Sequence, residues 1–170
     1  MNLQAFKKLA KQTGTVVVVT DRDGHQWLMS GENMYALNAL KIEESAVPEL
    51  LDLNAKELGQ IHIESGGMAM EHISIYPTFE ECELSYLATV RVDERELLVL
   101  EYDGRALFVD TNKIKPMGGE NPQRYTARMS NGELVCIAAY RDVTAGALVR
   151  READAEGIME NLRRIGALEA

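Results

Sequence analysis

The side chains most able to do chemistry in this chain are three lysines near its start and two arginines near its end. Lys7, Lys8 and Lys11 are spaced so that they share one face of a helix. Ammonium groups on one helix face can contact the phosphates of duplex DNA. Arg163 and Arg164 add positive charge near the other end of the chain. The pattern is equally typical of a solvated helix face, so both interpretations stay open.

Residues that could bind metal or act as nucleophiles are sparse. His62, His72 and Cys82 have a spacing that matches no zinc signature, so we expect no metal site. The pairs Gly66-Gly67 and Gly118-Gly119 fit neither a dinucleotide fingerprint nor a P-loop, and no GxSxG pattern occurs. We therefore expect no cofactor. The sequence leaves enzymatic activity open but favours a non-catalytic role.

The composition is that of an ordinary soluble domain. The 170 residues are 46% hydrophobic and 26% charged, and the net charge is −9. This charge argues against a protein that coats nucleic acid over its whole surface, yet it allows a local basic face. No apolar run is long enough to span a membrane, and no secretion signal opens the chain, so we expect a cytoplasmic protein. We expect one compact domain or two packed halves, about 1–75 and 76–170.

Helices are predicted near both ends of the chain. Apolar residues recur at helical spacing over residues 2–12, and Gly14 follows as a left-handed stop. A second amphipathic pattern runs from about 153 to 165. Between residues 43 and 60 the helical pattern is broken, and Asn54 and Glu57 have the spacing of a capping box.

Strands are predicted on both sides of three tight turns, Asp23-Gly24, Asp103-Gly104 and Asn131-Gly132. Alternating apolar residues predict another hairpin over 61–75 and a three-strand meander over 86–109. The fold class is therefore α+β, an antiparallel meandering sheet with helices at both chain ends. Residues 114–122, rich in proline and glycine, are predicted to form a flexible loop.

The first forty residues resemble the repeating unit of DNA sliding clamps. The resemblance rests on Leu3-Gln4-Ala5-Phe6-Lys7-Lys8-Leu9-Ala10, on Gly14-Thr15-Val16-Val17-Val18-Val19, on Asp23-Gly24 and on residues 27–40. In that family a helix with a basic exposed face precedes strands joined by an Asp-Gly turn. The same succession of turn, strand and turn recurs less clearly over residues 97–117.

The resemblance implies a clamp-like fold with internal repetition. It also implies that Lys7, Lys8 and Lys11 face duplex DNA, while the protein as a whole is acidic. Clamp subunits normally contain two or three such domains, and this chain has room for one domain or an abbreviated pair.

Three functions follow from these observations. The first is a non-catalytic binding or scaffolding protein with a clamp-like fold, in the DNA metabolism of a bacterium or its phage. The second is a protein–protein interaction module without a nucleic-acid role, which holds a partner segment or self-associates. The third is an enzyme with a cleft near residues 114–122.

Overall fold

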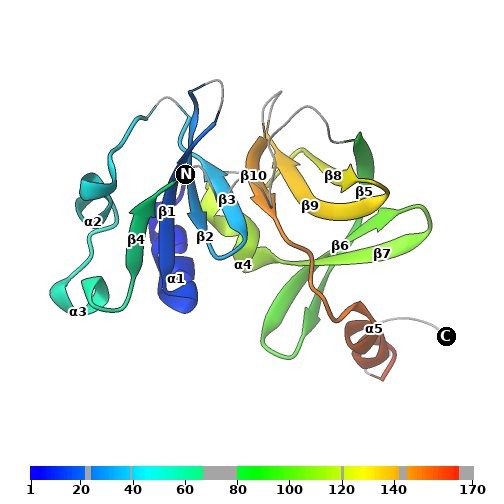
Figure 1. Ribbon diagram of the computed structural model, residues 1–170. Coiled ribbons are helices and arrows are strands. Elements are labelled where there is room, and N and C mark those ends of the chain that lie inside the picture. Colours follow the sequence, from blue (N-terminus) through cyan, green and yellow to red (C-terminus); the bar gives the residue numbers. More distant parts are fainter. Residues whose placement is uncertain (22–23, 39, 67–79, 120, 142–144, 165–170) are drawn as a thin grey trace.

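The protein has an α+β fold built on one large sheet (Figure 1). A computed structural model describes residues 1–21, 24–38, 40–66, 80–119, 121–141 and 145–164. In these ranges ten strands form a mostly antiparallel sheet in the order β4-β1-β2-β3-β10-β9-β8-β5-β6-β7. Helices lie near both ends of the chain, so the predicted fold class is confirmed.

The helical elements are short except for the first and the last. They are α1 (Leu3–Thr13), η1 (Glu44–Ala46), α2 (Val47–Leu50), α3 (Ala55–Leu58), α4 (Thr111–Ile114), η3 (Lys115–Met117) and α5 (Ala155–Arg164). The strands are β1 (Thr15–Thr20), β2 (Gln26–Ser30), β3 (Asn33–Ala36), β4 (His62–Ser65), β5 (Glu80–Val92), β6 (Arg95–Tyr102), β7 (Arg105–Asp110), β8 (Arg124–Ser130), β9 (Glu133–Tyr140) and β10 (Ala145–Val149). No helix in the described ranges combines the length and apolar character needed to cross a lipid bilayer.

Helix α1 forms where the sequence predicts it because both of its ends are capped. The Asn2 side chain accepts a hydrogen bond from the Ala5 N–H at 3.1 Å. Gly14 ends the helix in the left-handed conformation with φ of 73°. The apolar stripe is buried, and Phe6 packs edge-on against Tyr35 of β3 with ring centroids 5.6 Å apart. This contact fixes α1 against the middle of the sheet.

The strands flanking the three predicted turns pair as antiparallel neighbours. Residues 103–104 and 131–132 have positive φ angles, as tight hairpins require. Two residues of the first turn, Arg22 and Asp23, lie outside the described residues, as does most of the hairpin predicted over 61–75. β5, β6 and β7 form the predicted meander.

The central six strands form two units, each a meander preceded in the chain by helical residues. α1 is followed by the meander β1-β2-β3, and α4 with η3 is followed by the meander β8-β9-β10. The third strands of the two units, β3 and β10, pair antiparallel at the centre of the sheet (Figure 1). Counted outward from this antiparallel pair, both units have the same strand order, β3-β2-β1 on one side and β10-β9-β8 on the other.

The first helices of the two units lie side by side. α1 contacts both α4 and η3. The Asn2 N–H donates to the Pro116 carbonyl at 2.8 Å. Residues 111–117 are therefore helical and packed, with Pro116 and Met117 buried, so the prediction of a flexible loop is wrong for this part of the segment.

Both faces of the sheet are apolar along β1. Val16 and Val18 belong to the main core under the helices, whereas Val17 and Val19 belong to a second buried cluster with Trp27. Because successive strand residues point to opposite faces, an unbroken run of valines is the pattern of a strand buried on both sides.

α5 packs apart from the other helices. Its Ile158 and Leu162 join a third cluster with Phe108 of β7 and with residues of β5 and β6. Figure 1 shows α5 at the far side of the molecule from α1.

Candidate functional site

The basic face predicted on α1 is partly occupied by a single carboxylate. Glu57 of α3 forms ion pairs with the Lys7 ammonium at 2.9 Å and with the Lys11 ammonium at 3.0 Å. Its backbone and side chain also complete the predicted capping box with Asn54, whose N–H donates to Glu57 at 3.0 Å. Lys7 additionally donates to the Asp52 carbonyl. These contacts fasten the 52–57 segment onto α1.

The electrostatic surroundings of Glu57 strongly favour its ionised form. The hydrogen bond from Lys7, the Asn54 N–H and the hydrogen bond from Lys11 together lower the pKa of Glu57 to about 2. The residue is only 7% exposed. Glu57 therefore keeps its charge at neutral pH and compensates that of its two lysine neighbours.

The five residues predicted to bind nucleic acid lie on two separate helices. Lys8 is exposed, and it makes no hydrogen bond or ion pair with the described residues. Arg163 and Arg164 are exposed in the last turn of α5, where Arg164 donates to Asn161 at 3.2 Å. α5 packs on β5 and β7, whereas α1 packs on β1, β2 and η3. The structure thus groups the lysines with one another but not with the arginines.

A groove lies where the sequence predicts a cleft. It has a volume of about 890 Å³ and runs between the start of α1, the segment 114–125 and the strands β5 and β6. Its floor consists of the side chains of Leu84, Leu98, Ile114, Met117 and Tyr125, which are largely buried. Burial raises the pKa of Tyr125 to about 12, so its hydroxyl is neutral at physiological pH.

The polar groups around this groove are held by contacts within the chain. Arg124 forms an ion pair with Glu83 at 3.0 Å and lies over the Tyr140 ring at 4.3 Å. The Thr111 hydroxyl donates to Glu96 at 3.0 Å. Such mutually satisfied groups are suited to a binding surface, because each already has a fixed orientation.

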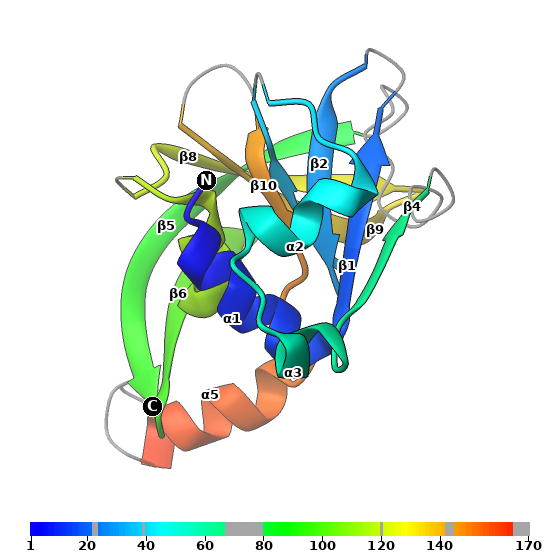
Figure 2. The same ribbon diagram turned by 90° about the vertical axis from the view of Figure 1, so that its left-hand side faces the viewer.

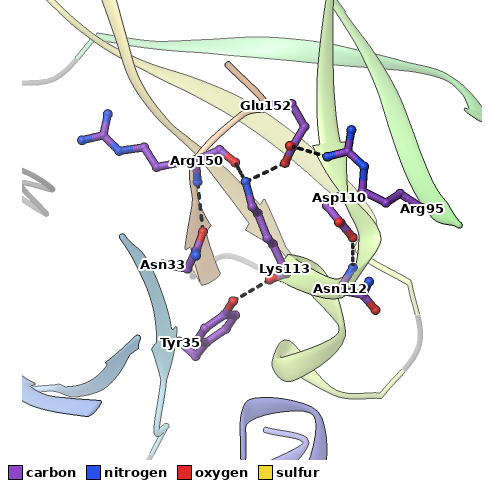
Figure 3. Close-up of polar contacts among 8 residues, drawn as sticks. All are labelled: Asn33, Tyr35, Arg95, Asp110, Asn112, Lys113, Arg150 and Glu152. Carbon is purple, nitrogen blue, oxygen red and sulfur yellow. Dashed lines mark hydrogen bonds and ion pairs between the residues drawn. The ribbon is translucent and has the colours of Figure 1, made fainter. Parts of the chain in front are cut away.

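A polar network on the other side of α4 ties the two repeated units together (Figure 3). Lys113 donates to Glu152 at 2.7 Å and to the Arg150 carbonyl at 3.1 Å. Its own carbonyl accepts from the Tyr35 hydroxyl at 2.7 Å, and burial raises the Tyr35 pKa. Arg95 pairs with the second oxygen of Glu152 at 3.1 Å. The network joins β3, α4, β6 and the segment after β10.

The described residues contain no group of three or more histidine, cysteine or acidic side chains able to hold a metal ion. His62 Nε2 lies 3.3 Å from Glu64 Oε2, and both residues belong to strand β4. Cys82 is half-buried, and His72 lies outside the described residues.

Sequence reasoning missed Glu57 as a partner of the lysines. Its capping-box spacing is visible in the sequence, but Lys7 and Lys11 lie 50 and 46 residues before it, so no local pattern links them. The network around Lys113 was missed for the same reason, since the partners lie on β3, on β6 and in the segment after β10.

Comparisons of the chain with protein-family models, with curated proteins and with solved structures found no match. The function is therefore argued from the geometry and the charges described above.

Proposed function

We propose that the chain is a non-catalytic binding and scaffolding protein with a clamp-like fold, acting in the DNA metabolism of a bacterium or its phage. The observation that carries this proposal is the repeated unit of a helix and three antiparallel strands, joined at the centre by β3 and β10. The first unit spans the residues that resemble the clamp repeat. The second unit, residues 111–149, supports internal repetition. It does not coincide with residues 97–117, where the sequence pattern suggests a second copy of the repeat.

DNA contact in this proposal relies mainly on Lys8. Lys7 has a side chain only 16% exposed and is held by Glu57. Lys11 shares the same carboxylate, although its side chain is 47% exposed. Lys8 is exposed, so its ammonium can approach a phosphate without breaking a hydrogen bond or ion pair to any described residue.

A salt titration of duplex-DNA binding tests the proposal. A labelled 30-base-pair duplex is titrated with the chain by fluorescence anisotropy between 25 and 200 mM NaCl. We expect binding that weakens as salt rises, and a Lys8→Gln variant whose log–log slope is smaller by about one. Lys41→Gln, at another exposed lysine, is the matched control and should leave the slope unchanged. Absence of binding at 25 mM NaCl would refute the DNA role.

A protein-binding module without a nucleic-acid role is the second candidate. The engagement of Lys7 and Lys11 by Glu57 favours it, because these contacts reduce the charge open to phosphates. The exposed side chain of Tyr86, which lines the groove, and that of the next residue, Leu87, favour it as well. In this case Lys8→Gln leaves binding of the partner protein unchanged.

A further inference from the structure

Strand β5 changes its partner half way along its length. Residues 80–84 pair with β8, and residues 85–92 pair with β6. Within the described ranges, no strand pairs with residues 85–92 on the side that faces β8. Backbone N–H and C=O groups on that side lack the ladder partners that an inner strand has. At a rise of about 3.3 Å per residue, this open edge is about 25 Å long.

The open edge carries two large apolar side chains that are exposed. Tyr86 is 55% exposed and Leu87 is 56% exposed. Both lie at a shift in the β5–β6 register between Tyr86 and Ala88, which marks a β-bulge. Within residues 85–92 the only charged side chain is Arg91, near the far end of the edge, and no proline occurs. In Figure 2, β5 runs along one margin of the molecule beside β6.

The groove described above lies against this edge. Tyr86 and Thr89 of β5 line it, together with Leu98 of β6 and the packed residues of α4 and η3. An added strand would therefore find main-chain partners along β5 and an apolar floor under alternate side chains, because strand side chains alternate between two faces.

The charges around the groove favour an uncharged occupant. Glu83 is neutralised by Arg124, Glu96 accepts from the Thr111 hydroxyl, and Lys115 donates to the side-chain amide of Asn112. The two carboxylates and two cations balance. A strongly charged segment would lose its hydration in the groove, and no excess of opposite charge there would compensate the loss. An apolar extended segment has no charged groups to desolvate, so it does not incur this cost.

We propose that the open edge of β5, residues 85–92, together with the adjoining groove, binds an extended, mostly uncharged segment of a partner protein by strand addition. The segment supplies main-chain hydrogen bonds along β5 and places aliphatic or aromatic side chains at alternate positions over the groove floor. This inference rests on the proposed binding role but is independent of DNA, since it uses none of the lysines of α1.

Selection of peptides on the full chain tests the inference. A phage-displayed library of random 12-residue peptides is selected on the immobilised protein, and enriched peptides are synthesised and measured by fluorescence polarisation. We expect sequences with apolar residues at alternate positions. Leu87→Lys should weaken their binding by about tenfold or more, because it places a charged side chain on the open edge where the added strand would pair. Leu40→Lys, at an equally exposed leucine, is the matched control and should change binding less than about twofold.

Amide hydrogen exchange separates strand addition from contact by side chains alone. Amides in residues 85–92 that face the open edge should exchange more slowly when the peptide is bound. The inference is overturned by protection confined to other strands, by binding that Leu87→Lys leaves intact, or by a selection without enriched peptides. It is also overturned if the free chain is a dimer whose own β5 edge is already protected. If the chain binds the selected peptides but does not bind duplex DNA, the DNA role is refuted and the strand-addition proposal stands.

Discussion

Glu57 stabilises the fold through two lysines that the sequence alone assigns to a partner. Because Lys7 is largely buried, removing the carboxylate leaves an ammonium group without its nearest counter-charge. We expect Glu57→Gln to lower the thermal unfolding midpoint at pH 7. Glu49→Gln, at an exposed glutamate of α2, is the control and should leave the midpoint nearly unchanged. Equal midpoints for both variants would contradict this role for Glu57.

The same carboxylate makes stability depend on pH in a defined range. The pKa of Glu57 falls from its ordinary value of 4.5 to about 2 in the folded protein. A lowered folded-state pKa means that the stabilisation is complete above about pH 4.5 and declines as pH falls toward 2. Urea denaturation of the wild type and of Glu57→Gln across this range measures the effect. The difference between the two proteins should shrink as the pH is lowered.

The packing of η3 on the start of α1 depends on a glycine. Gly118 has φ of 74°, and a Cβ there would lie 2.7 Å from the Asn2 nitrogen. Gly104 has φ of 70°, but its Cβ would meet open space. Gly104→Ala therefore reports the backbone strain alone, about 1–2 kcal/mol. Gly118→Ala adds the clash and also holds alanine at φ 74° and ψ 176°, a region open essentially to glycine alone, so it should cost about 1–3 kcal/mol more, as measured by urea denaturation. Equal losses would contradict this role for Gly118.

The elements predicted correctly are those that local rules define. Helix α1 has a cap at each end, and the hairpins have turn residues that tolerate positive φ angles. β10 was not predicted, because Ala145, Gly146 and Ala147 have little strand propensity. Pairing with β3 and β9 on both sides makes this segment a strand. Gly146 also leaves room for Met117, which would lie 2.9 Å from a Cβ at that position.

The lysines of the candidate site could be found in the sequence, but their roles could not. Helical spacing correctly places Lys7, Lys8 and Lys11 on α1. Which of them remains open to a ligand depends on α3, a four-residue helix whose position is set by tertiary packing. The open edge of β5 also could not be predicted from the sequence, because the alternation of apolar residues does not specify which strands are neighbours in the sheet.

The continuous sheet predicts that the two repeated units unfold together. β3 pairs with β2 on one side and β10 on the other, and the hydrogen bond from the Tyr35 hydroxyl to the Lys113 carbonyl joins elements of both units. Neither unit can open without exposing strand edges and buried residues of the other. We expect one calorimetric transition whose van 't Hoff and calorimetric enthalpies agree. Two resolved transitions would show instead that residues 1–66 and 80–164 are independent domains.

The antiparallel pair at the centre of the sheet also bears on how such a chain can arise. A protein with only one helix and three strands of this kind would leave its third strand as an open edge. The surface most complementary to that edge is the same edge of a second copy, because an antiparallel pair is symmetric. Duplication and fusion of a gene for such a dimeric unit would convert its subunit interface into the interior of a single chain.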